Sequence, residues 1–257
     1  MTLNPADSRP MYQQLAAELR DQIKSGGLKQ GDRIPTEAEL AERWEVSRNT
    51  IRLAIDVLRN EGLITSSQGR GNFVRAEPRM KYLASLTGSR RKRLETGRTA
   101  DTFAQQVTAQ GKTPRQVSTV EVIAAGPDTG SRLGLDPEQK VVIRRRVMYA
   151  DDEPIQLGDS YYPLEIVQGS AIMKDANVTE GTDQVLEDLG YVPAAYDDEI
   201  TWRMPTSEEA TKLHIAPGVP VVRLSRVSVT DDGQKIEDYV VILPGDRHTL
   251  HYSVDAE

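Results

Sequence analysis

The chain has 257 residues, enough for two domains with separate cores, and it contains no cysteine, which excludes disulfides and thiolate metal sites. Residues 1–98 hold 18 Lys and Arg against 12 Asp and Glu, so this part carries a net charge of +6 and residues 99–257 carry −13. No apolar run approaches the roughly 20 residues of a membrane span, and no signal-peptide pattern opens the chain, so we expect a cytoplasmic protein without a membrane partner. A basic head would attract nucleic acid phosphates, and an acidic body would stay off them.

The first predicted helix begins at Pro10 and ends at Gly26, because a proline suits the first turn and a glycine suits the end. Its apolar side chains share one face: Tyr12, Leu15, Ala16, Leu19 and Ile23. A turn-rich connector over 28–35 follows. Arg33 in this connector is either a phosphate contact or a solvated surface cation.

Two further helices joined by a tight turn are predicted over 36–61. Thr36 and Glu39 have the spacing of a capping box, in which each side chain satisfies a free backbone N–H of the other. Ser47 is placed to cap a second, longer helix. The apolar residues of that helix repeat at helical spacing and predict a buried stripe: Ile51, Ala54, Ile55 and Leu58.

The start of this longer helix is polar. Arg48, Asn49, Thr50 and Arg52 lie outside the apolar stripe, on the first turn and a half. A helix in the DNA major groove reads base edges with its N-terminal residues, and Arg and Asn have bidentate geometry for guanine and adenine. The alternative is an ordinary amphipathic helix pair with a solvated polar face.

A glycine-rich hairpin is predicted directly after the helices. Gly62 ends the long helix, and short strands over 63–65 and 72–75 flank the tip at 66–71. Three helices followed by such a hairpin predict a winged helix-turn-helix domain, with a tip that can enter a DNA groove. A plain glycine turn is the alternative.

Three ordered motifs in 10–75 resemble the DNA-binding domain of the GntR family of bacterial transcription regulators. They are Gly31-Asp-Arg-Ile-Pro-Thr-Glu-Ala-Glu-Leu, Val46-Ser-Arg-Asn-Thr-Ile-Arg, and Gln68-Gly-Arg-Gly-Asn-Phe-Val after Glu61-Gly-Leu-Ile. The resemblance implies a helix start in the groove, formed by Arg48, Asn49, Thr50 and Arg52. It also implies contacts with the DNA backbone or minor groove from Arg33, Thr36, Ser47, Gln68, Gly69, Arg70 and Gly71.

The rest of the chain predicts a second domain, so we expect an α+β protein with a winged helix-turn-helix domain over 1–75, a linker over 76–98 and a body over 99–257. Strand patterns cover 118–125, 141–150, 155–162, 195–204, 219–229 and 235–243, and helical patterns cover 184–189 and 207–213. These alternating elements predict an antiparallel sheet with helices against it.

The landmarks of the body resemble the UTRA effector-binding domain of the HutC-type subfamily. They are Phe103 with Gly111-Lys-Thr-Pro114, Asp151-Asp-Glu-Pro154 with Tyr162-Pro163, the stretch 210–220, and Pro244-Gly-Asp-Arg247. The resemblance implies a fold similar to chorismate lyase, a small-molecule effector, and a homodimer formed largely through this domain.

Candidate effector residues lie on the strand over 141–150. Alternation places Arg144 and Arg146 on one face and Arg145 on the other, and two guanidinium groups on one face suit a carboxylate or a phosphate. Ion pairing with nearby acidic residues is the alternative. Glu237 corresponds by its position to an acidic effector contact of the family, and we expect Thr102 and Tyr161 as secondary contacts.

The chain departs from the family pattern on the arginine-bearing hairpin and again near the C-terminus, where Leu243 and Pro244 stand in place of a Tyr just before Arg-Gly-Asp-Arg. Family members that sense phosphorylated amino sugars have a second arginine and a glutamate where this chain has Met148 and Gly158. This difference favours a more apolar small molecule than a sugar phosphate.

The sequence contains few residues in catalytic or metal-binding patterns. His248 and His251 have a spacing that would suit a metal on a helix, but their segment has a strand pattern, and His214 stands apart before a turn. No nucleophile motif or phosphate-cradling loop is present, so we expect no metal, no cofactor and no enzyme. The leading hypothesis is a repressor that a small molecule releases from a palindromic operator. A regulator whose body only dimerises, and a DNA-tethered lyase-like enzyme, are the alternatives.

Overall fold

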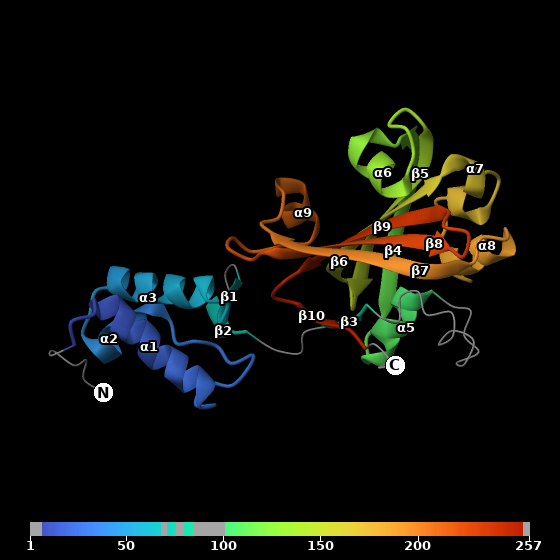
Figure 1. The fold of residues 1–257 in the computed structure, drawn as a ribbon. Coiled ribbons are helices and arrows are strands. Elements are labelled where there is room, and N and C mark those ends of the chain that lie inside the picture. Colours follow the sequence, from blue (N-terminus) through green and yellow to red (C-terminus); the bar gives the residue numbers. More distant parts are fainter. Residues whose placement is uncertain (1–6, 68–70, 76–79, 85–100, 254–257) are drawn as a thin grey trace. The chain divides into compact units, whose positions relative to one another are not determined.

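The computed structural model describes residues 7–67, 71–75, 80–84 and 101–253 (Figure 1). The chain divides into two compact units, Met1–Pro78 and Arg79–Glu257. The first unit has one hydrophobic core, and the second has several smaller clusters of buried side chains on its sheet. The fold class is α+β, as predicted.

The N-terminal unit is a winged helix-turn-helix. Its elements are α1 (Met11–Lys24), α2 (Glu37–Trp44), α3 (Arg48–Asn60), β1 (Ile64–Ser67) and β2 (Gly71–Val74). Both predicted caps are present: Thr36 and Glu39 form a complete capping box, and the Ser47 hydroxyl accepts a hydrogen bond from the Thr50 N–H at 3.1 Å. The predicted apolar stripe of α3 is fully buried against α1 and α2.

The connector between α1 and α2 is more ordered than the turn-rich segment predicted from the sequence. Its backbone runs beside β2: the Ile34 N–H donates to the Asn72 carbonyl at 2.8 Å, and the Val74 N–H donates to the Asp32 carbonyl at 2.8 Å. The β1–β2 hairpin is here called the wing. The connector adds a third, short strand-like segment beside it.

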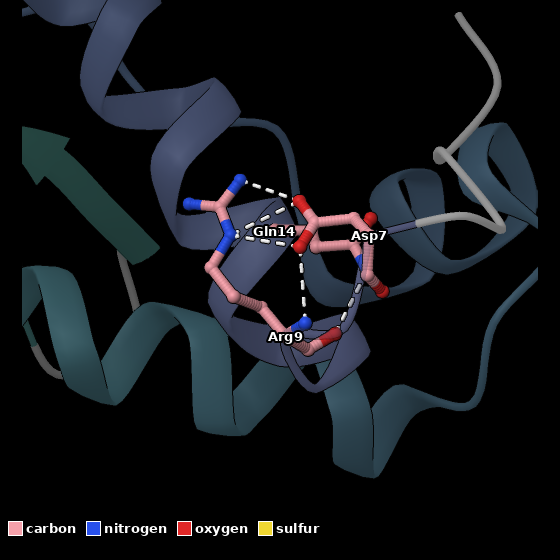
Figure 2. Close-up of polar contacts among 3 residues, drawn as sticks. All are labelled: Asp7, Arg9 and Gln14. Atoms are coloured by element: carbon pink, nitrogen blue, oxygen red, sulfur yellow. Dashed lines mark hydrogen bonds and ion pairs between the residues drawn. The ribbon is translucent and has the colours of Figure 1, made fainter.

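The start of α1 is fixed by a small polar cluster (Figure 2). No side chain caps this helix directly. Instead, Asp7 and Arg9 form an ion pair with an oxygen–nitrogen distance of 2.6 Å, and Gln14 donates to the backbone carbonyl of Arg9 at 2.8 Å. These contacts connect the segment before the helix to its first turn.

The C-terminal unit is built on a six-stranded antiparallel sheet with the strand order β4-β5-β6-β9-β8-β7. The predicted sheet is confirmed, and the hairpin between β5 and β6 turns at Asp151 and Asp152, whose φ angles of 52° and 63° are those of a tight two-residue turn. The strands are β4 (Pro114–Ala124), β5 (Lys140–Ala150), β6 (Glu153–Pro163), β7 (Pro193–Arg203), β8 (Val221–Thr230) and β9 (Lys235–Pro244).

Among the described residues, six short helical segments accompany this sheet, and sequence patterns predicted only two of them, α8 and α9. One of the others, α6, contains two glycines and a proline, which weakens any local helix signal. Its Arg132 forms an ion pair at 2.7 Å with Asp238 of β9, whose side chain is fully buried. The segments are α5 (Thr102–Ala109), α6 (Gly126–Leu133), α7 (Leu164–Val167), η1 (Ala171–Met173), α8 (Thr182–Asp188) and α9 (Ser207–Lys212).

A second, smaller sheet corrects the predicted linker over 76–98. Residues 80–83 form β3 (Met80–Leu83), which pairs in parallel with β10 (His248–His251). On the other edge of β3, Gln110 accepts a hydrogen bond from the Lys81 N–H at 2.8 Å. Part of the predicted linker is thus integrated into the C-terminal unit, because distant segments satisfy its backbone. Residues 76–79 and 85–98 lie outside the described residues.

None of the helices in the described ranges is long and apolar enough to cross a membrane.

Candidate DNA interface and ligand site

The first turn of α3 presents polar side chains with few internal partners. Arg48 and Asn49 are exposed, and within the described chain no hydrogen bond or ion pair engages either side chain. The Thr50 hydroxyl is hydrogen-bonded to the Ser47 hydroxyl at 2.8 Å, which stabilises the cap. Arg52 forms an ion pair with Glu37 at 3.2 Å but keeps 61% of its side chain exposed. These groups are available to a ligand outside the domain.

Arg33 lies beside the wing, close to the tip end of β2 at Gly71. Gly71 has a φ of 106°, and a Cβ added there would be 3.2 Å from the Arg33 Nε. Arg33 and Arg43 of α2 also line a surface hollow of about 470 Å³, and neither guanidinium has an ion-pair partner among the described residues. Arg43 was not among the predicted DNA contacts. The predicted tip contacts Gln68, Gly69 and Arg70 lie outside the described residues.

The candidate ligand site lies on one face of the central strands of the large sheet. In the strand register, Arg144 of β5 lies opposite Ser160 of β6, which lies opposite Tyr239 of β9. Directly opposed residues project to the same face, and so do residues two apart on one strand. Arg146 and Glu237 therefore share this face, as predicted, while Arg145 lies on the other face and pairs with Glu121 at 2.9 Å.

Arg146 is the cation of this site. Its guanidinium donates to the Ser160 hydroxyl and, at 3.5 Å, to the Gly158 carbonyl, and it lies 5.2 Å from the centre of the Tyr239 ring. No carboxylate lies within ion-pair distance of it in the described part of the chain. A half-buried arginine without an anionic partner is suited to bind an anion.

Glu237 is the acidic group of this site and is 6% exposed. It accepts a hydrogen bond from the Tyr162 hydroxyl at 2.7 Å. Burial raises the pKa of Glu237 above its usual value, and the nearby Asp183 adds to this effect. A buried carboxyl with one hydroxyl donor can still bind a hydroxyl or ammonium group of a ligand.

Arg144 has a different role from the predicted effector contact. Its side chain is 2% exposed and donates to the carbonyls of Ile172, Lys174 and Ala176 at 2.8, 2.5 and 3.1 Å. Burial lowers the pKa of Arg144, and the neighbouring Arg146 lowers it further. Because its guanidinium is occupied by backbone carbonyls, Arg144 holds the segment after η1 in place.

Tyr161, predicted as a secondary effector contact, lies on the face of the sheet opposite to Arg146. In the register it lies opposite Ile143 and Asp238, on the face away from Arg146. Its neighbour Tyr162 takes the place beside Glu237. Tyr162 and Ser160 were missed by sequence reasoning, although strand alternation from the hairpin turn would have indicated them.

Thr102 is the first residue of α5 and lies next to the helix cap Asp101. The Asp101 carboxylate accepts a hydrogen bond from Gln116 of β4 at 2.7 Å. This contact ties the start of α5 to the sheet. The role of Thr102 itself stays a prediction.

The departures from the family pattern at Met148 and Gly158 both lie beside Arg146. Met148 is 2% exposed, and its sulfur accepts a hydrogen bond from Gln156 at 2.8 Å. The Tyr239 ring occupies the space next to Gly158, since a Cβ there would be 2.9 Å from the tyrosine oxygen. A thioether and an aromatic ring therefore occupy the places where the family members that sense phosphorylated amino sugars carry a charged arginine and a charged glutamate.

The histidines are separated by the strand geometry. His248 is 7% exposed and burial lowers its pKa to about 4, whereas His251 at the end of β10 is exposed. In the described residues no group of three or more potential ligands is arranged to hold a metal ion.

Comparison with known families assigns both units. The family described as bacterial regulatory proteins, gntR family, matches residues 11–74, and the UTRA domain matches residues 109–249. This protein belongs to the GntR family, in the group that carries a UTRA domain.

Similar proteins agree with this assignment. The chain is 31% identical to the uncharacterised HTH-type transcriptional regulator SCO4628 of Streptomyces coelicolor, over 96% of this chain and 93% of that protein. It is 30% identical to the mannosyl-D-glycerate transport/metabolism system repressor MngR of Escherichia coli, over 89% of each chain. A crystal structure of a GntR-family transcriptional regulator matches it with a TM-score of 0.68 and 25% identity, over 97% of this chain and 99% of that one.

These findings establish the function class. This GntR-family protein is a DNA-binding transcription regulator with an effector-binding domain of the UTRA type.

Proposed function

We propose that this GntR-family protein is a repressor that reads its operator with the start of α3 and is released by a small molecule bound in its UTRA domain. The observation that carries the DNA-reading part is that Arg48 and Asn49, beside Arg52, are exposed and have no side-chain partner in the part of the chain that the structure describes. Base edges offer these side chains the hydrogen bonds that the protein does not. Arg33, Thr36, Ser47 and the wing residues 68–71 contact the sugar–phosphate backbone or the minor groove.

Alanine substitution tests this assignment. Arg48→Ala, Asn49→Ala and Arg52→Ala should each cost about 1–3 kcal/mol on the preferred duplex and relax base preference. Arg33→Ala, the backbone-contact control, should weaken binding to all duplexes alike and reduce its salt dependence. Fluorescence anisotropy on preferred and scrambled duplexes measures both. Equal losses on both duplexes for the α3 variants would remove α3 from base reading.

The working form is a homodimer on a palindromic operator. One recognition helix reaches only a few base pairs, which is too little for selectivity in a genome, and two heads on a shared body double the readout. Light scattering should give about twice the chain mass of 28.5 kDa. A footprint should show two symmetric half-sites, and insertion of half a helical turn between them should abolish binding. Full affinity for a single half-site would contradict the dimer.

The effector binds between Arg146 and Glu237. The unpaired guanidinium suits a carboxylate or another anion, and the buried carboxyl suits a hydroxyl or ammonium group, so the ligand carries both kinds of group. The relative MngR represses a mannosyl-D-glycerate system, and glycerate is a hydroxylated carboxylate. Binding must favour the arrangement that leaves DNA, since a ligand with equal affinity for both states shifts neither.

A thermal-shift screen of small hydroxylated and amino acids should find a ligand, because binding to the folded state raises the melting temperature. Arg146→Ala and Glu237→Ala should then weaken its binding in calorimetry, and the ligand should lower operator affinity in anisotropy. Arg145→Ala, on the opposite face of the same strand, is the matched control. Unchanged affinity in both site variants would place the pocket elsewhere, and a domain that binds no ligand would favour the alternative in which it only dimerises.

A further inference from the structure

The recognition helix carries one large apolar side chain on its outer face. In α3 the buried residues Ile51, Ala54, Ile55 and Leu58 define the inner face. Leu53 lies one helical turn after Asn49, on the side opposite this stripe, because residues four apart share a face. It is 45% exposed, and its neighbour Arg52 is also exposed. An apolar group thus stands in the middle of the polar surface that the proposed function turns toward DNA.

We propose that Leu53 contacts the C5 methyl group of a thymine in each operator half-site. In the major groove this methyl is the apolar feature that distinguishes thymine, and apolar side chains recognise it by contact. The inference rests on the proposed function of α3. Asn49 and Arg52 lie next to Leu53 on the exposed surface of α3 and supply hydrogen bonds, so the three residues together read adjacent bases.

The alternative is that Leu53 only faces solvent, since single exposed leucines are common on protein surfaces. Two features favour DNA. Leu53 is on the helix that positions Arg48 and Asn49, whose side chains have no partner in the described chain, whereas Val57, one turn further along, packs against the core of the domain. Leu53 is therefore a large apolar side chain of α3 that the core does not cover, and it lies beside Asn49 and Arg52.

Replacement of thymine by uracil provides a direct test, because it removes the methyl and keeps the base pair. The preferred duplex is first selected from a random library with the full-length protein, and each thymine is then replaced in turn. Burial of one methyl-sized group is worth about 0.8 kcal/mol, so replacement in one half-site should weaken wild-type binding about fourfold, and replacement in both half-sites should weaken it about fifteenfold. Leu53→Ala should bind the thymine and uracil duplexes equally. Met11→Ala removes a side chain of similar exposure from α1 and should keep the wild-type difference.

The outcomes separate this inference from the proposed function. Arg52→Ala should relax base preference and still distinguish thymine from uracil at the Leu53 position. If Leu53→Ala keeps the uracil penalty, or if the wild type shows none, the methyl contact is refuted even when Asn49→Ala relaxes base preference. If the Arg48, Asn49 and Arg52 variants all keep the wild-type base preference, α3 does not read bases and the proposed function fails first. Circular dichroism of each variant should match the wild type, since all the positions are exposed.

Discussion

The contact between Gly158 and Tyr239 offers a quantitative test of the ligand site. A Cβ at Gly158 would be 2.9 Å from the tyrosine oxygen, 3.1 Å from Cε2 and 3.4 Å from Cε of Met148. Gly158→Ala must therefore displace the tyrosine ring, and overpacking of this kind costs about 1–3 kcal/mol. The φ of Gly158 is not in the left-handed region, so alanine in the strand also gains about 0.5–1 kcal/mol. The net destabilisation should be about 0–2.5 kcal/mol.

A double-mutant cycle isolates the contact. Tyr239→Leu removes the ring, and in that background Gly158→Ala should be neutral or slightly stabilising, which gives a coupling energy of about 1–3 kcal/mol. Urea unfolding is followed by far-UV circular dichroism, which reports both units, and by fluorescence in a Trp202→Phe background, which leaves Trp44, buried in the N-terminal unit, as the only tryptophan. This background serves for every tryptophan-fluorescence measurement. The Trp44 midpoint should not change, so a shift seen in circular dichroism alone belongs to the C-terminal unit. An equal cost of Gly158→Ala with and without the tyrosine ring would refute the proposed packing.

Three further results are expected. Ser47→Ala removes the cap of α3 and should lower the stability of the N-terminal unit by about 1 kcal/mol, measured as the urea midpoint of tryptophan fluorescence; an unchanged midpoint would contradict the cap. Burial raises the pKa of Glu237 above 4.5, so the contribution of Glu237 to stability is complete below pH 4.5 and is lost as the pH rises through the folded-state pKa. The melting temperature of the wild type should therefore fall over that pH range. Glu237→Gln should abolish this fall. Arg144→Met frees three backbone carbonyls and should speed hydrogen exchange over 172–176, while Arg145→Met, on the opposite face, should not; equal exchange in both would show that Arg144 does not hold this segment.

The sequence by itself determined the DNA-binding unit in detail. The caps at Thr36 and Ser47 and the apolar stripe of α3 are interactions between residues three or four apart, so their chemistry is visible in a short stretch of sequence. Once these local signals set the helix and its buried face, the outer position of Arg48 and Asn49 follows. Strand alternation likewise placed Arg144 and Arg146 on one face.

Only the tertiary structure decided what those side chains contact. Arg144 and Arg146 have the same residue type and face, yet one meets carbonyls of a segment about 30 residues away and the other meets no acidic partner in the described chain. The ion pair that supports α6 joins Arg132 to Asp238, and β3 pairs with residues near the end of the chain. Sequence periodicity reports which face a residue occupies, but its partner across that face comes from a distant segment, and only folding brings the two together.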